Sequence, residues 1–358
     1  MKALFTVLIF FMLTTISPAA EQATSVYDEV VLTEDVTWSG SILVRGFVVV
    51  APQATLRIDP GTVVRFSASA AQQQPNLVVQ GRLHAAGSPE KPIVLMSALT
   101  KPERGSWGGI VFLSTEKRNL LEQCRIEYAA TGIDLRFSTV TLKNVSIMQT
   151  NTALLSHDGV VQMTGGTVSD SSTGIEMHNS EFDGRSMTVD SCQRGFLLEK
   201  SSVVLLEPTV VNNRQSGAEA SDCRIKISGG EFSGNAVGAR INGGEGQIVM
   251  SRFLRNSQTA LHLLGSRLRI QRCLFADNLK DALRTEDGRA LLLNNAFVSN
   301  VGFNLYNAGS EAVSARQNWW GTTERSLVRQ KIYDASRDKN AGVVEVLPWL
   351  NEKPALTP

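Results

Sequence analysis

Apolar and polar residues repeat in one pattern about every 21 or 22 residues through the central and C-terminal parts of the chain. Each repeat opens at a small anchor residue, which begins a run of alternating apolar and polar positions. The anchors are Gly132, Ala153, Gly174, Gly195, Gly217, Gly238, Ala260, Ala282 and Gly302. A unit this short cannot bury its own apolar side, so it needs a neighbour above and below. The repeat therefore predicts the coils of a solenoid.

Each repeat has two further positions, at fixed distances after the anchor, that are apolar in almost every coil. Fifteen residues after the anchors stand Ile147, Val168, Val189, Val210, Phe232, Phe253, Phe275 and Phe297. Ten residues after them stand Leu142, Met163, Gly184, Leu205, Ile227, Ile248, Ile270 and Leu292. Inward residues two apart, such as Val140 and Leu142, indicate strands. We therefore predict an all-β fold, a right-handed parallel β-helix solenoid with three short strands per coil and about twelve coils.

A third column is polar. Eighteen residues after the anchors stand Thr150, Ser171, Cys192, Asn213, Asn235, Asn256, Asn278 and Asn300. An inward amide at a corner can hydrogen-bond the same amide one coil away and can satisfy backbone groups of the turn. The column predicts a ladder of buried asparagines.

Several motifs outside these columns carry a resemblance to a known family. They are ATLRIDPGTVV at residues 54–64, LVVQGRLHA at 77–85, SWGGIVF at 106–112 and NWWG at 318–321. On these motifs the chain resembles the pectate-lyase-like right-handed β-helix proteins, which are secreted or periplasmic bacterial proteins. The resemblance extends over nearly all of the mature chain. It implies the fold strongly and an activity hardly at all.

The N-terminus has the pattern of a secretory signal peptide. Lys2 precedes an apolar run, and small residues follow near position 20. We expect a signal peptide over residues 1–20, one β-helix domain with its terminal caps over 21–350, and a tail over 351–358. The mature protein is then exported, to the periplasm or the cell exterior, with no membrane span.

Charge and cysteine content bear on the partners and the disulfide bonds that the protein could have. Thirty-five basic and 34 acidic residues balance, which gives no reason to expect nucleic acid as a partner. The repeat places Cys124 and Cys273 seven coils apart, and Cys192 and Cys223 on different sides of the solenoid. Disulfides need Cα atoms within about 7 Å, so we expect four free, inward thiols.

Catalytic motifs of the resembled family are mostly missing. Pectate lyases of this fold use an aspartate cluster for calcium and an arginine base, and neither pattern is present. Polygalacturonases carry an Arg-Ile-Lys motif, which the chain matches at Arg224, Ile225 and Lys226. Ile225 falls on an inward column, so we interpret this match as structural, with its two neighbours pointing outward.

Polar and titratable residues gather at the outward positions two and four after the anchors. They are Asp134, Arg136, His157, Glu176, His178, Glu199, Glu219, Arg240, Asn242, His262, Arg284 and Glu286. The resemblance implies that a substrate groove would run over this strand face. We select as candidate catalytic residues Glu176, His178, Glu199, Glu219 and Arg240. The alternative is that these side chains are simply solvated.

Three of these residues suggest a metal. His157, His178 and Glu199 follow one another at 21-residue spacing, so they stack on adjacent strands about 4.8 Å apart. Two imidazoles and a carboxylate are ligands suited to zinc or copper. A divalent metal is therefore the one candidate cofactor, and a chance stack is the alternative.

Aromatic residues near the chain ends have two interpretations. Trp319, Trp320 and Trp349 could stack on a sugar, but large aromatics are also suited to covering the open end of the core. We favour the capping role, with Trp38 serving the opposite end.

We therefore predict an exported, non-catalytic β-helix scaffold or binding module that holds a polysaccharide or a cell-surface protein on its long strand face. A carbohydrate-active enzyme, either a polysaccharide lyase or a glycosidase, is the alternative. A periplasmic metal-handling protein is a second alternative, because a copper accessory protein of nitrous oxide reductase has this type of repeat. The oligomeric state stays open.

Overall fold

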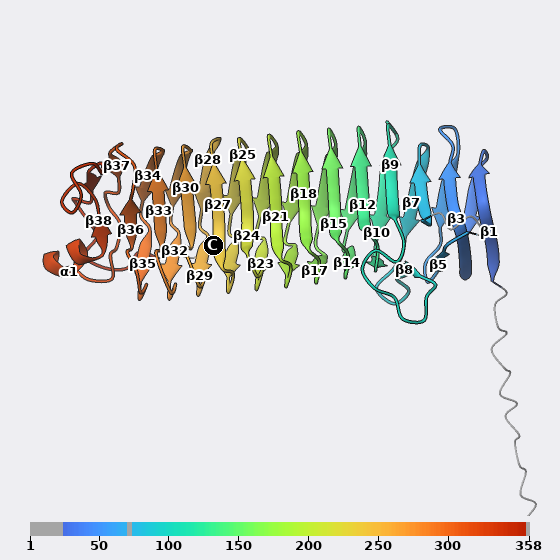
Figure 1. Cartoon of the computed structure of the whole chain (residues 1–358), viewed down its shortest axis with the longest axis horizontal. Coiled ribbons are helices and arrows are strands. Elements are labelled where there is room, and N and C mark those ends of the chain that lie inside the picture. Colours follow the sequence, from blue (N-terminus) through green and yellow to red (C-terminus); the bar gives the residue numbers. More distant parts are fainter. Residues whose placement is uncertain (1–23, 70–73, 356–358) are drawn as a thin grey trace, which may run out of the picture.

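The protein forms one long solenoid of about 13 turns, in which strands of successive coils pair in parallel (Figure 1). The computed structural model describes residues 24–69 and 74–355. The expected right-handed parallel β-helix is confirmed, with three strands in each complete coil. The expected signal peptide lies outside the described residues.

The first strands of the coils form one side of the solenoid. They are β3 (Ser41–Val50), β6 (Asn76–Val79), β9 (Gly109–Leu113), β12 (Thr131–Arg136), β15 (Thr152–His157), β18 (Thr173–His178), β21 (Arg194–Glu199), β24 (Ser216–Ser221), β27 (Val237–Asn242), β30 (Leu261–Leu264), β33 (Leu283–Glu286), β36 (Leu305–Asn307) and β38 (Ile332–Tyr333). At the N-terminal end, β1 (Ser25–Leu32) pairs with β3.

The second strands form a separate sheet of 14 strands. They are β2 (Val36–Trp38), β4 (Thr55–Ile58), β7 (Arg82–Ala86), β10 (Asn119–Glu122), β13 (Thr139–Lys143), β16 (Val160–Thr164), β19 (Glu181–Arg185), β22 (Ser202–Leu206), β25 (Arg224–Ser228), β28 (Glu245–Val249), β31 (Arg267–Gln271), β34 (Arg289–Leu293), β37 (Val313–Ser314) and β39 (Val344–Glu345).

The third strands close each coil, and from β14 onward each has three residues. They are β5 (Val63–Ser67), β8 (Ile93–Ser97), β11 (Cys124–Glu127), β14 (Ser146–Met148), β17 (Thr167–Ser169), β20 (Thr188–Asp190), β23 (Thr209–Val211), β26 (Glu231–Ser233), β29 (Arg252–Leu254), β32 (Leu274–Ala276) and β35 (Ala296–Val298). A short helix, α1 (Arg325–Gln330), precedes β38. Within the described residues, the helical structure is too short to cross a bilayer.

Aromatic rings stack along the core at the third strands. Phe232, Phe253, Phe275 and Phe297 are fully buried, and successive ring centroids lie 5.0 Å apart. Trp320 continues the stack 4.7 Å beyond Phe297. Because each ring covers the next, this column confirms the expected apolar position and places Trp320 in the core at the C-terminal end.

Each corner of a coil uses a residue in the left-handed backbone region. In the coil that begins at β12, Phe137, Asn144 and Gln149 have φ of 50°, 50° and 54°. The residue directly after each of the three is buried and turns inward. The backbone amide of that inward residue then needs an acceptor in the next coil.

The asparagine ladder, formed by Asn213, Asn235, Asn256, Asn278 and Asn300, meets this need at the third corner. Asn256 Oδ1 accepts the backbone N–H of Asn235 at 3.1 Å, and Asn256 Nδ2 donates to Phe232 O at 3.1 Å. The same Nδ2 donates to Asn278 Oδ1 at 3.0 Å. The ladder expected from the sequence is confirmed.

A second, shorter asparagine ladder was not predicted from the alignment of the repeats. At the second corner, Asn295 Oδ1 accepts the Cys273 backbone N–H, and Asn295 Nδ2 donates to Asn318 Oδ1, both at 2.9 Å. Two asparagines are too few to stand out as a column. The position is otherwise filled by valine, glycine, methionine, proline, serine or cysteine, which hides its periodicity.

The anchor positions are small because successive first strands approach each other closely there. A side chain at Gly195 would collide with the carbonyl oxygen of Gly217. The ninth expected anchor, Gly302, is wrong. Strand β36 pairs Leu305 with Leu283, so Asn304 is the residue that follows Ala282 in the column. The 22-residue spacing continues, but the small residue does not.

The four cysteines are free and buried, as expected. Burial raises the pKa of the Cys124 and Cys273 thiols to about 12 and that of Cys192 to about 11. Burial also raises the pKa of the Cys223 thiol. At neutral pH all four are therefore protonated and shielded from solvent.

Replacing Phe253 with alanine should destabilise the protein by ~3 to 5 kcal/mol, because the change leaves a cavity between two stacked rings. Chemical denaturation measures the free energy of unfolding. The outward residue Gln162 provides a control, since Gln162→Ala should cost less than about 0.5 kcal/mol. Equal effects of the two substitutions would contradict the assigned core column.

Replacing Asn256 with alanine should cost ~1 to 3 kcal/mol, because the Asn235 N–H and the Phe232 carbonyl lose their buried partner. Asn242, an exposed asparagine at the end of β27, is the matched control. Thermal unfolding of both variants checks the prediction. A neutral Asn256→Ala would show that water replaces the ladder without loss.

Candidate functional site

The first-strand face is the outward side of the first strands, and it carries the candidate residues expected from the sequence. The register places them in two columns along the solenoid axis. One column contains Glu176, Leu197, Glu219, Arg240, His262, Arg284, Tyr306 and Tyr333. The other contains His157, His178, Glu199, Ser221, Asn242, Leu264 and Glu286. The face is therefore a long, mostly polar strip that contains a few apolar residues.

His157, His178 and Glu199 lie on adjacent strands, as expected. The two imidazole rings stack with centroids 4.7 Å apart and planes 9° from parallel. His178 Nδ1 lies 3.3 Å from Glu199 Oε2, and its Nε2 lies 3.0 Å from Glu176 Oε1. Both contacts are hydrogen bonds when each ring nitrogen carries a proton, so this arrangement satisfies an imidazolium.

The metal interpretation of this cluster stays a prediction. Within residues 24–69 and 74–355, no group of three or more His, Cys, Asp or Glu side chains is placed to hold a metal ion. Stacked parallel rings direct their nitrogens side by side, and both nitrogens of His178 face carboxylates. Metal binding through His178 would require the ring to leave one of these partners.

The other two candidate catalytic residues, Glu219 and Arg240, are neighbours in register on β24 and β27. Glu219 Oε1 accepts a hydrogen bond of 2.7 Å from Ser216 Oγ. Arg240 is exposed, and it flanks His262 on the next strand. Arg240 therefore belongs to a second cluster further along the face. The other members of this cluster were not among the catalytic candidates selected from the sequence.

This second cluster consists of Arg240, His262, Arg284, Glu286 and Tyr306. Glu286 Oε1 lies 3.1 Å from His262 Nε2 and accepts a hydrogen bond of 2.8 Å from Arg284 Nε. The Arg284 guanidinium lies over the Tyr306 ring, 4.5 Å from its centroid. Carboxylate, imidazole, guanidinium and phenol thus meet on three consecutive strands.

Electrostatics in this cluster favour a neutral imidazole beside a carboxylate. Burial lowers the pKa of His262 below its ordinary value, the Glu286 hydrogen bond acts in the opposite direction, and Arg240 and Arg284 lower it further. The hydrogen bond from Arg284 lowers the pKa of Glu286. A neutral His262 donates Nε2–H to Glu286, which leaves the lone pair on Nδ1. The ring is therefore oriented like a general base.

Aromatic rings extend this cluster to the end of the face. Tyr306 and Tyr333 stack with centroids 4.1 Å apart, and Phe303 meets both rings edge-on. The Arg337 guanidinium lies 5.2 Å from the Phe303 centroid. All three rings are partly exposed. The C-terminal end of the face thus combines two guanidinium groups with aromatic surface.

The sequence did contain a signal for this cluster. Arg240, His262, Arg284 and Tyr306 are each 22 residues apart, so they form one column. The misplaced anchor at Gly302 hid Tyr306, because it assigned that residue to the other column. No local motif marks the cluster, since its members come from four separate coils.

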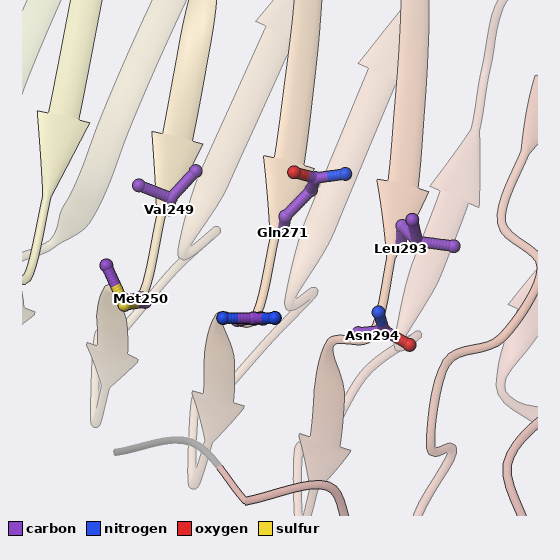
Figure 2. Close-up of a pocket in the computed structure, with 6 residues that line it drawn as sticks. Val249, Met250, Gln271, Leu293 and Asn294 are labelled. Atoms are coloured by element: carbon purple, nitrogen blue, oxygen red, sulfur yellow. The ribbon is translucent and has the colours of Figure 1, made fainter. Parts of the chain in front are cut away.

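A shallow hollow of about 370 Å³ lies away from this face, beside the second corner. Figure 2 shows Val249, Gln271 and Leu293 from successive second strands along it, with Met250 and Asn294 at the adjoining turns. Arg272 is the one ionisable residue among those that line it. This lining provides no acid and base pair, so the first-strand face is the better candidate site.

Comparisons with known proteins agree with the fold. A family model for the right handed beta helix region matches residues 173–319, and one for the pectate-lyase like beta helix domain matches residues 27–137. Each match covers less than half of the chain. No curated protein matches the chain. Both matches agree with the right-handed parallel β-helix fold of the chain.

Solved structures similar to this chain include those of the periplasmic alginate epimerase AlgG. A single-residue mutant of that enzyme has 8% identity and a TM-score of 0.39, and another AlgG structure has 9% identity and a TM-score of 0.37. Both alignments cover 87% of this chain and 74% of the epimerase chain. Similarity at this level concerns the fold alone.

The His262 imidazole should titrate below its ordinary pKa of about 6.5 in an NMR pH titration. Because the Glu286 carboxylate stabilises the protonated ring, Glu286→Gln should lower the pKa of His262 further. The exposed residue Glu311 supplies the control Glu311→Gln, which should leave the titration unchanged. An unchanged His262 pKa in Glu286→Gln would show that the contact does not form in solution.

Proposed function

We propose that the protein is an exported, non-catalytic binding module that holds an acidic polysaccharide along the C-terminal half of its first-strand face. The observation that carries the proposal is the column of Arg240, His262, Arg284 and Tyr306. Guanidinium groups bind carboxylates, and aromatic rings offer apolar surface to sugar faces. The chemistry of this column thus suits a uronate chain.

Geometry supports a chain that lies along the solenoid axis. Arg240 and Arg284 are two coils apart, roughly 10 Å at the spacing of paired strands. Arg240 is exposed and has no carboxylate partner within 4.0 Å among the described residues, so it is free to bind an anion. Arg284 is held by Glu286 and Tyr306, which fixes the direction of its guanidinium group.

Export is part of the proposal and rests on the N-terminal sequence pattern. Lys2 and the apolar run after it are typical of a signal peptide. An exported protein can then meet an acidic polysaccharide outside the cytoplasm or at the cell surface. A cell-surface protein with an acidic segment is the competing partner, and a binding assay with purified glycan separates the two.

Replacing Arg240 and Arg284 with alanine together should weaken binding of polygalacturonate or alginate at least about tenfold, because two charge-assisted contacts are lost. Isothermal titration calorimetry measures the affinity, with neutral dextran as the ligand control. Arg316→Ala removes an arginine already paired with Glu345 and should leave affinity unchanged. Wild-type protein that binds no acidic glycan would contradict the proposal.

A carbohydrate-active enzyme is the second candidate, and the His262 and Glu286 pair favours it. A neutral imidazole oriented by a carboxylate could remove the proton beside a uronate carboxylate, while Arg284 stabilises the charge that develops. In a lyase reaction the electron pair of the broken C–H bond forms a carbon–carbon double bond as the glycosidic C–O bond breaks, and the leaving sugar oxygen keeps the electrons of that bond and takes up a proton from water.

The unsaturated product of such a lyase absorbs ultraviolet light, so incubation with uronate polysaccharides distinguishes the candidates. Absorbing product from the wild type, lost in His262→Ala while binding persists, would support the enzyme. Binding without product would support the binding module.

A further inference from the structure

A cationic patch lies on the second-strand face, on a different sheet from the proposed glycan site. Strands β25, β28, β31 and β34 pair in register and direct their alternate residues outward. The outward cations are Arg224, Lys226, Arg267, Arg269 and Arg289, and the outward carboxylate among them is Glu245. Four neighbouring strands thus carry five positive charges and one negative charge on their outward side.

Most of these cations lack a carboxylate partner among the residues that the structure describes. Arg224 Nε lies 3.7 Å from Glu245 Oε1, and both side chains are largely exposed. Among the described residues, no carboxylate lies within 4.0 Å of Lys226, Arg267 or Arg269. Like charges on adjacent strands repel one another. An anion that bridges them would remove this repulsion.

The patch also has a defined shape. An open hollow of about 430 Å³ is lined by Arg224, Lys226, Arg267 and Arg269, with Gly246 between them, and Glu245 also lines it. A side chain at Gly246 would collide with the Ile225 carbonyl oxygen, so the backbone of β28 is close to that of β25 there. The four cations and Glu245 therefore border one shallow, open depression.

We propose that this patch is a second glycan site, which binds a segment of an acidic polysaccharide that lies along the solenoid axis. In one column Arg224, Arg267 and Arg289 flank or follow Glu245, and in the other Lys226 and Arg269 flank Gln247. Cations two coils apart are separated by roughly 10 Å. Carboxylates at regular intervals on a linear chain match such columns, and guanidinium groups bind them in bidentate fashion.

The limits of the patch favour a narrow ligand over a membrane surface. On its N-terminal side β22 presents Val204 and Leu206, and β19 then presents Glu181 beside the ion pair of Asp183 with Arg185. A broad anionic surface would approach these carboxylates as well as the cations. A single chain can contact β25 to β34 alone.

The choice of a polysaccharide as the ligand rests on the proposed function, whereas the anionic character of the ligand rests on the patch itself. Two sites on different sheets would let one protein molecule hold two glycan segments. The protein would then act as a cross-link between chains.

The double variant Arg267→Ala, Arg269→Ala should bind polygalacturonate at least about tenfold more weakly in an assay whose first-strand site is already disabled by Arg240→Ala and Arg284→Ala. Outward substitutions leave the core columns intact, and thermal unfolding verifies this. Arg185→Ala is the matched control, since Arg185 lies on the same sheet but is paired with Asp183 at 2.8 Å. Binding in the background variant should also weaken as salt rises.

The outcomes separate the two proposals. Unchanged affinity after loss of Arg267 and Arg269, with affinity lost after loss of Arg240 and Arg284, would overturn the second site alone. Residual binding that disappears with Arg267 and Arg269 would support it, even if the first-strand face proves inactive. Equal binding of single-stranded DNA at the patch would overturn the assignment to a polysaccharide.

Discussion

The hydrogen bond from a corner amide to an inward side chain of the next coil is the interaction on which this solenoid depends. Every coil turns three times, and each turn removes a backbone N–H from the strand ladders. At the third corner an asparagine of the following coil accepts that N–H, while its amide group donates to a carbonyl of the preceding coil. Ser171 plays the accepting role for Thr150. Without these acceptors, the buried corners would carry unpaired polar groups.

Because corners and core columns determine the fold, outward side chains are free to vary from coil to coil. The same column on the first strands holds Glu219, Arg240, His262 and Tyr306 without any change in backbone register. A solenoid can therefore assemble a site from residues far apart in sequence, provided that their spacing matches the coil. Both proposed sites, on two different sheets, have this origin.

Periodicity explains what the sequence could and could not predict. Phe253 and Asn256 recur at fixed offsets, so their burial and partners follow from the repeat alone. The stacking of His157 on His178 follows from a 21-residue spacing. The hydrogen bond between His262 and Glu286 joins the two outward columns across the adjacent strands β30 and β33, and it depends on side-chain conformations that no repeat specifies. The Asn295 corner was missed because a column of mixed residue types has no visible period.

Under the export that we propose, the four buried thiols have a consequence for the order of folding and oxidation. A thiol that is protonated and enclosed does not form a thiolate that could attack a disulfide. Cys124, Cys192, Cys223 and Cys273 are then vulnerable to oxidation only while the chain is unfolded. In an oxidising compartment, folding and disulfide formation compete in time, and a coil that closes first keeps its cysteine reduced for the life of the protein.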